Sequence, residues 1–176
     1  MKKYIALLKG INVGGHKKVP MAELRALLSK VGLSNVQTYI QTGNVFFETK
    51  ESSSSNIEKT IRQAIHSHFG FEVLVMVKTR HDLQRIFNDY PFTNEKKEAS
   101  YFMMLHNVPS EEMIVEASKK VYEFDQYVIK NDCIYLFCDK GMGKSKFNTN
   151  FFENKLNTFA TARNYKTMLK LLSLSS

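Results

Sequence analysis

The chain has few cysteines and no long apolar run, and each shortage excludes a class of protein. Two cysteines among 176 residues cannot build the disulfide framework of a small secreted domain. No apolar segment approaches the ~20 residues that a membrane-spanning helix requires. The run YIALL near the start is five residues long, shorter than the roughly 7–15 apolar residues of a signal peptide. We therefore expect a cytoplasmic protein with no membrane association.

Side chains that could hold a metal ion or form a catalytic constellation are also sparse. His66 and His68 are two positions apart on an expected helix, so their side chains diverge. Cys133 and Cys138 are five positions apart on an expected strand, so they face opposite sides. No Ser/His/Asp or Cys/His arrangement has a recognisable local context. We expect no metal site and no cofactor, and the sequence leaves open whether the protein is an enzyme.

The chain is rich in apolar residues and in positive charge. Hydrophobic residues make up 43%, which excludes disorder for most of the chain. Lysine and arginine number 25 against 17 acidic residues, a net charge of +8. Residues 1–50 hold eight basic and two acidic groups and residues 141–176 six and one, whereas residues 51–140 hold 11 and 14. If the two basic ends meet, they form one surface that attracts anions; ordinary solvated lysines are the alternative.

The hydrophobic pattern predicts two successive βαββαβ halves. Gly43-Asn44 is expected as a two-residue hairpin turn, Ser55 with Glu58 as a capping box, and Pro109-Ser110 as a helix start. In the first half we expect a strand at 3–9, a helix at 20–31, strands at 36–41 and 45–49, a helix at 55–69 and a strand at 71–79. In the second half we expect a strand at 100–108, a helix at 110–121, strands at 126–130 and 133–138, a helix at 150–156, a strand at 158–162 and a helix at 165–172.

This order predicts an α+β protein made of two ferredoxin-like halves in tandem, with mixed or antiparallel sheets and helices on one face. The expected halves are residues 1–80 and 100–176, joined by a connecting helix and loop at 81–99. Two sequence echoes support the repeat: Val19-Pro20 matches Val108-Pro109, and Arg80 matches Arg163 at a strand end before a helix.

Three segments could bind an anion. The first, KGINVGGHKK, places glycines and three lysines between a strand and a helix, where backbone N–H groups can face an anion; a flexible turn is the alternative. The second, Gly141–Lys146, resembles the end of a P-loop but lacks the earlier glycine, which disfavours nucleotide hydrolysis. In the third, Arg163 at a strand end could present a bidentate fork beside Asn164, the expected cap of the last helix; a cap with a surface arginine is the alternative.

The expected hairpin Gln37–Glu48 carries aromatic residues on one face. Its alternation places Tyr39 and Phe46 on the same side of the sheet as Gln41 and Asn44. Such a face could stack bases, as RNA-recognition modules of this topology do. Because GNVFFET lacks the basic-glycine-aromatic pattern of those modules, packing of the aromatic rings against the other half of the protein is the favoured interpretation.

Several motifs together resemble a known family. LKGINVGG, MAELRALL and VQTYIQTGNVFF are similar to the opening signature of a widespread bacterial family, the domain-of-unknown-function family 1697. SKFNTNFFENKL and TARNYKT resemble its closing segments. The family usually has Arg at the place of Lys9, Ser at Thr42 and Trp at Tyr165; Lys for Arg loses a bidentate fork. The resemblance implies paired ferredoxin-like units and the location of a ligand site, and it implies no reaction.

We therefore predict one anion-binding site made by the two chain ends, for a phosphate-bearing ligand that is a nucleic acid or a nucleotide. An enzyme acting on a small phosphorylated metabolite is one alternative, with Glu23, Tyr39, His16 and Lys9 as the available acids and bases. A structural or protein-interaction domain is the other. The predicted ligand-binding residues are Lys9, Gly10, Asn12, Gly14, Gly15, Tyr39, Thr42, Asn44, Lys144, Ser145, Lys146, Arg163, Asn164 and Thr167.

Overall fold

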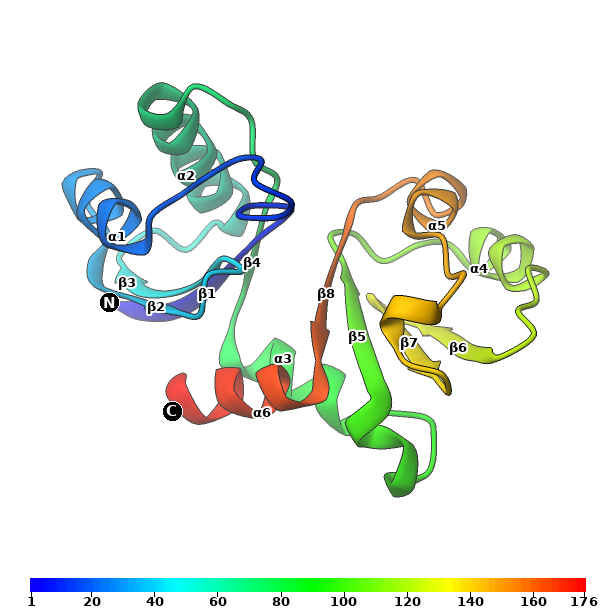
Figure 1. The fold of residues 1–176 in the computed structure, drawn as a ribbon. Coiled ribbons are helices and arrows are strands. Elements are labelled where there is room, and N and C mark those ends of the chain that lie inside the picture. Colours follow the sequence, from blue (N-terminus) through cyan, green and yellow to red (C-terminus); the bar gives the residue numbers. More distant parts are fainter. The chain divides into compact units, whose positions relative to one another are not determined.

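The computed structural model describes residues 1–176, and the chain divides into two compact units (Figure 1). Unit 1 consists of Met1–Leu83 and Leu171–Ser176, and unit 2 of Gln84–Lys170. The boundaries fall inside helices α3 (Arg80–Asn88) and α6 (Tyr165–Leu174). No helix has the length and apolar character needed to cross a membrane.

Unit 1 contains a four-stranded antiparallel sheet in the order β2-β3-β1-β4. Helix α1 connects β1 to β2, and β3 lies between these two strands. Helix α2 connects β3 to β4, and β1 lies between them. Each βαβ unit therefore has another strand inserted between its own two, which is the split βαβ arrangement. Its elements are β1 (Lys2–Leu8), α1 (Met21–Lys30), β2 (Ser34–Tyr39), β3 (Asn44–Thr49), α2 (Ser54–Phe69) and β4 (Val75–Lys78).

The core of unit 1 lies between the sheet and its two helices. Alternate residues of β1 point into it, beginning with Tyr4 and ending with Leu8. Helix α1 contributes Leu24 and Leu28, which are spaced one turn apart, and α2 contributes a similar stripe that includes Ile61. Both helices therefore cover the same face of this sheet (Figure 1).

Unit 2 repeats the arrangement, with the antiparallel strand order β6-β7-β5-β8. Helices α4 and α5 share a core with one sheet face, in which Phe152 is fully buried. On the other face, Phe102 of β5 stacks on Phe87 of α3 with ring centroids 5.7 Å apart. The elements are a 3₁₀ turn (Asn94–Ala99), β5 (Ser100–Leu105), α4 (Glu111–Ser118), β6 (Asp125–Lys130), β7 (Cys133–Cys138), a second 3₁₀ turn (Met142–Lys144), α5 (Thr149–Lys155) and β8 (Ala160–Asn164).

One pair of backbone hydrogen bonds shows the repeat directly. In unit 1, Leu8 N at the end of β1 donates to Gly43 O at 2.8 Å. In unit 2, Leu105 N at the end of β5 donates to Asp132 O, also at 2.8 Å. Each bond ties the first strand to the hairpin turn that precedes the third. The predicted α+β class with two βαββαβ halves is therefore confirmed.

Each sheet also holds a buried cation at the same register position of its last strand. Lys78 lies opposite Ile5 and is 9% exposed, and Arg163 lies opposite Phe102 and is 6% exposed. Ile5 and Phe102 each precede the anchoring leucine of their strand by three positions. The predicted match of Arg80 with Arg163 is wrong, because Arg80 begins helix α3 whereas Arg163 lies within β8.

Two local predictions are also corrected. The first hairpin turns over residues 40–43, so Asn44 is the first residue of β3 rather than part of a two-residue turn. Helix α2 is capped by Ser53, whose hydroxyl accepts from Asn56 N at 3.3 Å, and not by a Ser55/Glu58 box. The Glu58 carboxylate instead accepts a hydrogen bond from the backbone N–H of Val77 in β4, at 2.9 Å. Because Val77 is far from Glu58 in the sequence, local motifs could not predict this contact.

Candidate anion-binding sites

The predicted ligand-binding residues divide between the two units. A single site made by both chain ends would need residues of both units, and it stays a prediction. Those in unit 1 are Lys9, Gly10, Asn12, Gly14, Gly15, Tyr39, Thr42 and Asn44. Those in unit 2 are Lys144, Ser145, Lys146, Arg163, Asn164 and Thr167.

The glycine-rich loop of unit 1 is a small hairpin rather than a featureless turn. His16 N donates to Val13 O at 3.0 Å, and Gly14 and Gly15 between them have positive φ angles of 57° and 77°. Positive φ at both central positions is the requirement of a type I′ turn, which glycine meets without strain. The tip is exposed, and Val13 keeps 63% of its surface in solvent.

Asn12 holds this loop in place. Its amide Nδ2 donates to Val19 O at 3.0 Å and to Gln41 O at 2.8 Å, while its Oδ1 accepts from Val19 N at 2.8 Å. The side chain therefore links the loop to Val19, two residues before α1, and to the hairpin turn. Because backbone groups use its donors and acceptor, Asn12 supports the loop rather than facing a ligand.

A basic hollow of about 320 Å³ lies beside the start of the loop. Lys9, Gly10, Lys17 and Arg62 line it together with Glu72. Lys17 Nζ donates to the backbone carbonyl of Glu72 at 2.7 Å, and Arg62 lies 3.7 Å from the Glu72 carboxylate. The cations outnumber the carboxylate, but their contacts with Glu72 compete with any anion.

The residues of the hairpin in unit 1 that were predicted to bind a ligand make hydrogen bonds within the hairpin. Asn44 is fully buried, and its Nδ2 donates to Tyr39 O and to Thr42 Oγ1, both at 3.1 Å. Phe46 is 8% exposed and lies in register with Gln37. Tyr39 lies opposite Asn44, as the predicted alternation requires, whereas Gln41 lies in the turn. Phe46 is buried rather than displayed for stacking, and its packing against the other half stays a prediction.

The predicted residues of β8 and α6 are also engaged. Arg163 Nη1 donates to Thr161 Oγ1 and to the Ala162 carbonyl, both at 2.8 Å. Burial lowers the pKa of Arg163 to about 10, because its charged form loses hydration. Asn164 Oδ1 accepts from Thr167 N at 2.9 Å, so Asn164 caps α6 as predicted.

Lys144 and Lys146 line a hollow of about 450 Å³ in unit 2. It lies beside the end of α4, the start of β6, the end of β7 and the start of α5. Two further lysines, Lys120 and Lys140, share it. The acidic residues in the lining are Glu123 and Asp125, so four cations face two carboxylates. We name it the lysine hollow, and its lining consists of Lys120–Asp125, Lys140, Lys144, Lys146, Asn148 and Phe151.

Ser145 sets the shape of the loop that carries these lysines. Its hydroxyl donates to Asp125 Oδ2 at 2.7 Å and accepts from Phe147 N at 3.1 Å. Asp125 is 9% exposed, so one of the two carboxylates is turned inward to a hydroxyl partner. Ser145 was predicted as a ligand residue; in the structure it positions its lysine neighbours. Strand β7 before this loop pairs antiparallel with both neighbours, which is not the setting of a P-loop.

Aromatic rings complete the lysine hollow. Lys120 Nζ lies 5.9 Å from the ring centroid of Tyr122 and 5.8 Å from that of Phe151. Lys140 Nζ lies 3.1 Å from the centroid of Phe124. None of these rings, nor Lys120 and Lys140, was predicted from the sequence. The only local signal was the pair of lysines followed by Tyr122 and Phe124 in KKVYEF, and the net negative charge of residues 51–140 drew attention away from it.

The residues considered for catalysis or metal binding are scattered. The carboxylate of Glu23 lies 3.4 Å from His68 Nε2, and both side chains are about half exposed. Burial raises the pKa of the Cys138 thiol, which disfavours the reactive thiolate. No three His, Cys, Asp or Glu side chains are grouped so as to hold a metal ion. The chemistry that the hollows offer is attraction of anions.

The chain belongs to the family described as "Protein of unknown function (DUF1697)", whose model matches residues 1–135. A search among curated proteins found no match. The structure is similar to that of conserved bacterial protein SP0830 from Streptococcus pneumoniae, with a TM-score of 0.75 and 21% sequence identity, covering 99% of this chain and 98% of that chain. At this identity the likeness shows the fold. The resemblance drawn from the sequence motifs is confirmed.

Proposed function

We propose that this DUF1697 protein binds a phosphate-bearing ligand, a nucleotide or a nucleic acid, and that the lysine hollow of unit 2 is the principal site. One observation carries the proposal: Lys120, Lys140, Lys144 and Lys146 gather around a single hollow with two carboxylates. Ammonium groups that line one hollow attract phosphate oxygens through charge and through N–H donors.

The size and exposure of the hollow support the same ligand class. Its volume of about 450 Å³ falls within the roughly 300–1,000 Å³ of small-molecule sites. The four lysines are exposed and can adjust to a ligand, whereas Asp125 is held by Ser145. The basic hollow beside Lys9 and Gly10 is the secondary candidate, because Glu72 already engages its cations.

A purely structural role is the competing proposal, and ligand binding by the folded wild-type protein separates the two. Arg163→Ala then serves as the stability control, because Arg163 lies outside the lysine hollow. Its guanidinium is buried and bonded to β8, so Arg163→Ala should lower stability. If the protein is a binding protein with its site in the lysine hollow, this variant keeps its affinity for phosphate-bearing ligands under conditions where it stays folded.

The test is fluorescence anisotropy with a 5′-labelled ten-nucleotide single strand, repeated from 50 to 200 mM salt. The double variant Lys144→Ala/Lys146→Ala should bind more weakly, and its logarithmic salt slope should fall by about 1.4, since each phosphate contact on a single strand contributes roughly 0.7. The control is Lys30→Ala/Lys50→Ala, which removes the same charge from exposed positions outside the hollow.

Nucleoside triphosphates and inorganic polyphosphate are tested in parallel by thermal shift. Tight binding at 100-fold excess over Kd stabilises by about 2.7 kcal/mol, which is readily seen as a higher Tm. Absence of binding for the strand and for both small phosphates would refute the proposal. Equal losses in the two double variants would refute the placement in the lysine hollow.

A further inference from the structure

The feature that the anion-binding proposal does not use is the ring of Phe124. The chain has 13 phenylalanines, and Phe124 alone is exposed, keeping 44% of its surface in solvent. It lies in the lysine hollow, one residue before β6 begins. An exposed phenyl ring costs hydration free energy, so its place among four lysines calls for a partner.

Within the chain that partner is Lys140. Its Nζ lies 3.1 Å from the centroid of the Phe124 ring, so the ammonium group sits on the ring face. A cation in this position is attracted by the electron-rich face, by about 0.5–1 kcal/mol at an exposed site. The interaction is weak enough for a phosphate to draw the ammonium group away, and this would free the ring face.

The freed face is suited to an aromatic group of the ligand. A nucleobase stacks on a phenyl ring with about 1–3 kcal/mol of free energy, whatever its identity. In a duplex the base faces are already stacked on one another, so a ring recessed in a hollow can reach only an unpaired base. The hollow, at about 450 Å³, has room for a nucleotide but not for a duplex.

We propose that Phe124 is the stacking platform for one unpaired base, and that Lys140 leaves this ring face to bind the phosphate of the same nucleotide with Lys144 and Lys146. This inference rests on the proposed function and narrows its ligand to a base-bearing phosphate that is not in a duplex. A single strand and a free nucleotide share this chemistry. Phe124 thereby sets the specificity of the site for a base over a bare phosphate.

The experiment compares a ten-nucleotide single strand with an abasic strand of the same length and charge. The wild-type protein should bind the base-containing strand about tenfold more tightly, the equivalent of ~1.4 kcal/mol of stacking. Phe124→Leu should reduce this affinity to the abasic level and leave abasic binding unchanged. Phe124→Trp should keep the discrimination, since its ring also stacks. Phe71→Leu in unit 1 removes a ring outside the lysine hollow; because Phe71 packs against the unit 1 core, its binding is compared under conditions where the variant stays folded, and it should equal that of the wild type.

The outcomes separate the two proposals. If neither strand and no mononucleotide binds, this inference fails, and the proposed function fails with it only if nucleoside triphosphates and polyphosphate also do not bind. If both strands bind equally to the wild type, phosphate binding stands and base stacking is overturned. Equal loss of both strands in Phe124→Leu would also overturn stacking, because it indicates a structural effect. If the wild type discriminates as expected, binding of a mononucleotide and of a duplex is measured as well. Binding of the mononucleotide shows whether a free nucleotide suffices as the ligand, and the duplex should bind no more tightly than the abasic strand.

Discussion

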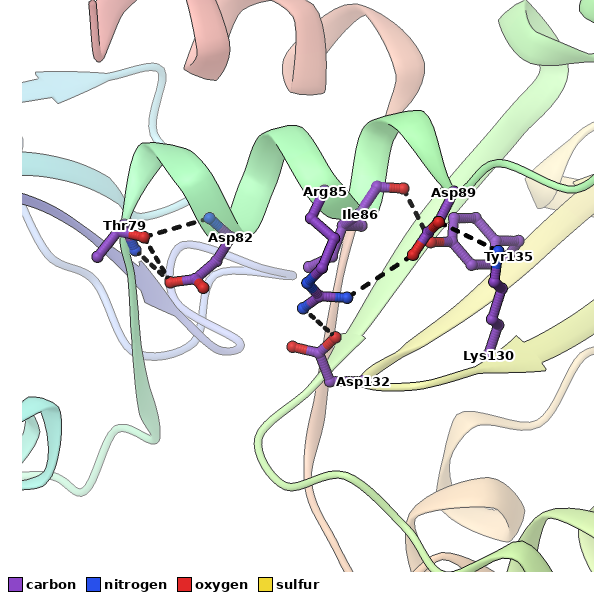
Figure 2. Close-up of polar contacts among 8 residues, drawn as sticks. All are labelled: Thr79, Asp82, Arg85, Ile86, Asp89, Lys130, Asp132 and Tyr135. Carbon is purple, nitrogen blue, oxygen red and sulfur yellow. Dashed lines mark hydrogen bonds and ion pairs between the residues drawn. The ribbon is translucent and has the colours of Figure 1, made fainter.

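Arg85 and Asp132 form an ion pair in which Nη2 lies 2.6 Å from Oδ1, and it joins α3 to the turn between β6 and β7 (Figure 2). The Asp132 side chain is 8% exposed and that of Arg85 is 35% exposed. Asp89 extends the network: its carboxylate lies 3.1 Å from Lys130 Nζ and 3.9 Å from Arg85 Nη1. Within unit 2 these contacts hold the second half of α3 against the sheet.

Removal of Asp132 should therefore destabilise unit 2. Asp132→Ala leaves Arg85 without its closest carboxylate and is expected to lower the free energy of unfolding by about 2 kcal/mol. Urea unfolding followed by circular dichroism measures the change. Asp139→Ala removes the same charge from an exposed position and should alter stability by less than about 0.5 kcal/mol. Equal effects of the two variants would contradict a specific role for the pair.

The buried hydroxyl of Tyr135 should make the free energy of unfolding depend on pH in the alkaline range. This hydroxyl donates to Ile86 O at 2.8 Å, and burial raises the pKa of Tyr135 well above its usual value of about 10. Because the unfolded chain loses this proton at lower pH than the folded chain, the stabilisation is complete below pH ~10 and is lost as the pH rises beyond it. Burial raises the pKa of Tyr90 and Tyr127 in the same direction.

The free energy of unfolding should thus decline as pH rises above about 10, and Tyr135→Phe should make the decline shallower. Urea titrations at several pH values between 8 and 11 measure both slopes, and absorbance at 295 nm reports tyrosine ionisation. A Tyr135→Phe variant with an unchanged slope would show that other groups control alkaline unfolding.

Gly43 should tolerate no side chain. A Cβ at this position would lie 2.5 Å from Leu8 Cβ, and the backbone φ of +83° disfavours L residues. Gly43→Ala is expected to cost at least about 2 kcal/mol, since backbone strain adds to overpacking. Gly10→Ala is the matched control: φ is +69°, but no atom lies within 4 Å, so only about 1 kcal/mol is expected. Thermal unfolding of both variants makes the comparison, and equal losses would show that strain alone matters.

Asn12 should govern the order of the glycine-rich loop. Asn12→Ala removes the side-chain hydrogen bonds to Val19 and Gln41, with an expected loss of about 1–2 kcal/mol. Amide hydrogen exchange at His16, whose N–H donates to Val13 O across the loop, should become faster. Lys18→Ala, at an exposed position of the same loop, should leave exchange unchanged. Unaltered exchange in Asn12→Ala would show that the loop is ordered by its own turn.

Local signals in the sequence determined most of the secondary structure. The 3.6-residue and two-residue hydrophobic periods place the helices and strands, because each element has one face in a core. Ser110 and Asn164 begin α4 and α6 as predicted, since a cap needs only its neighbours along the chain. Gly70 ends α2 in a left-handed conformation for the same local reason.

Predictions failed where a distant segment competes for a group. Glu58 was expected to cap α2, but Val77 N in β4 donates to its carboxylate instead. The turn expected at Gly43-Asn44 is displaced because Leu8 packs against Gly43, and Asn44 enters the core. Neither competitor is near in the sequence, so neither could be inferred from it.

The basic composition of the chain ends pointed to Lys144 and Lys146, which line the lysine hollow, whereas other features of that hollow depend on the fold. By itself the sequence determined the fold class and the excess charge, because periodicity and composition are local properties. Only the tertiary structure decided which lysines share a hollow and which amides are used internally. The antiparallel pairing of β6 with β7, in which Asp125 lies opposite Cys138, brings Phe124 and Lys140 together at the open end of the hairpin. Lys120, which follows α4, and Lys144 and Lys146, which precede α5, reach the same hollow only through the tertiary fold of unit 2, because no local pattern relates these segments.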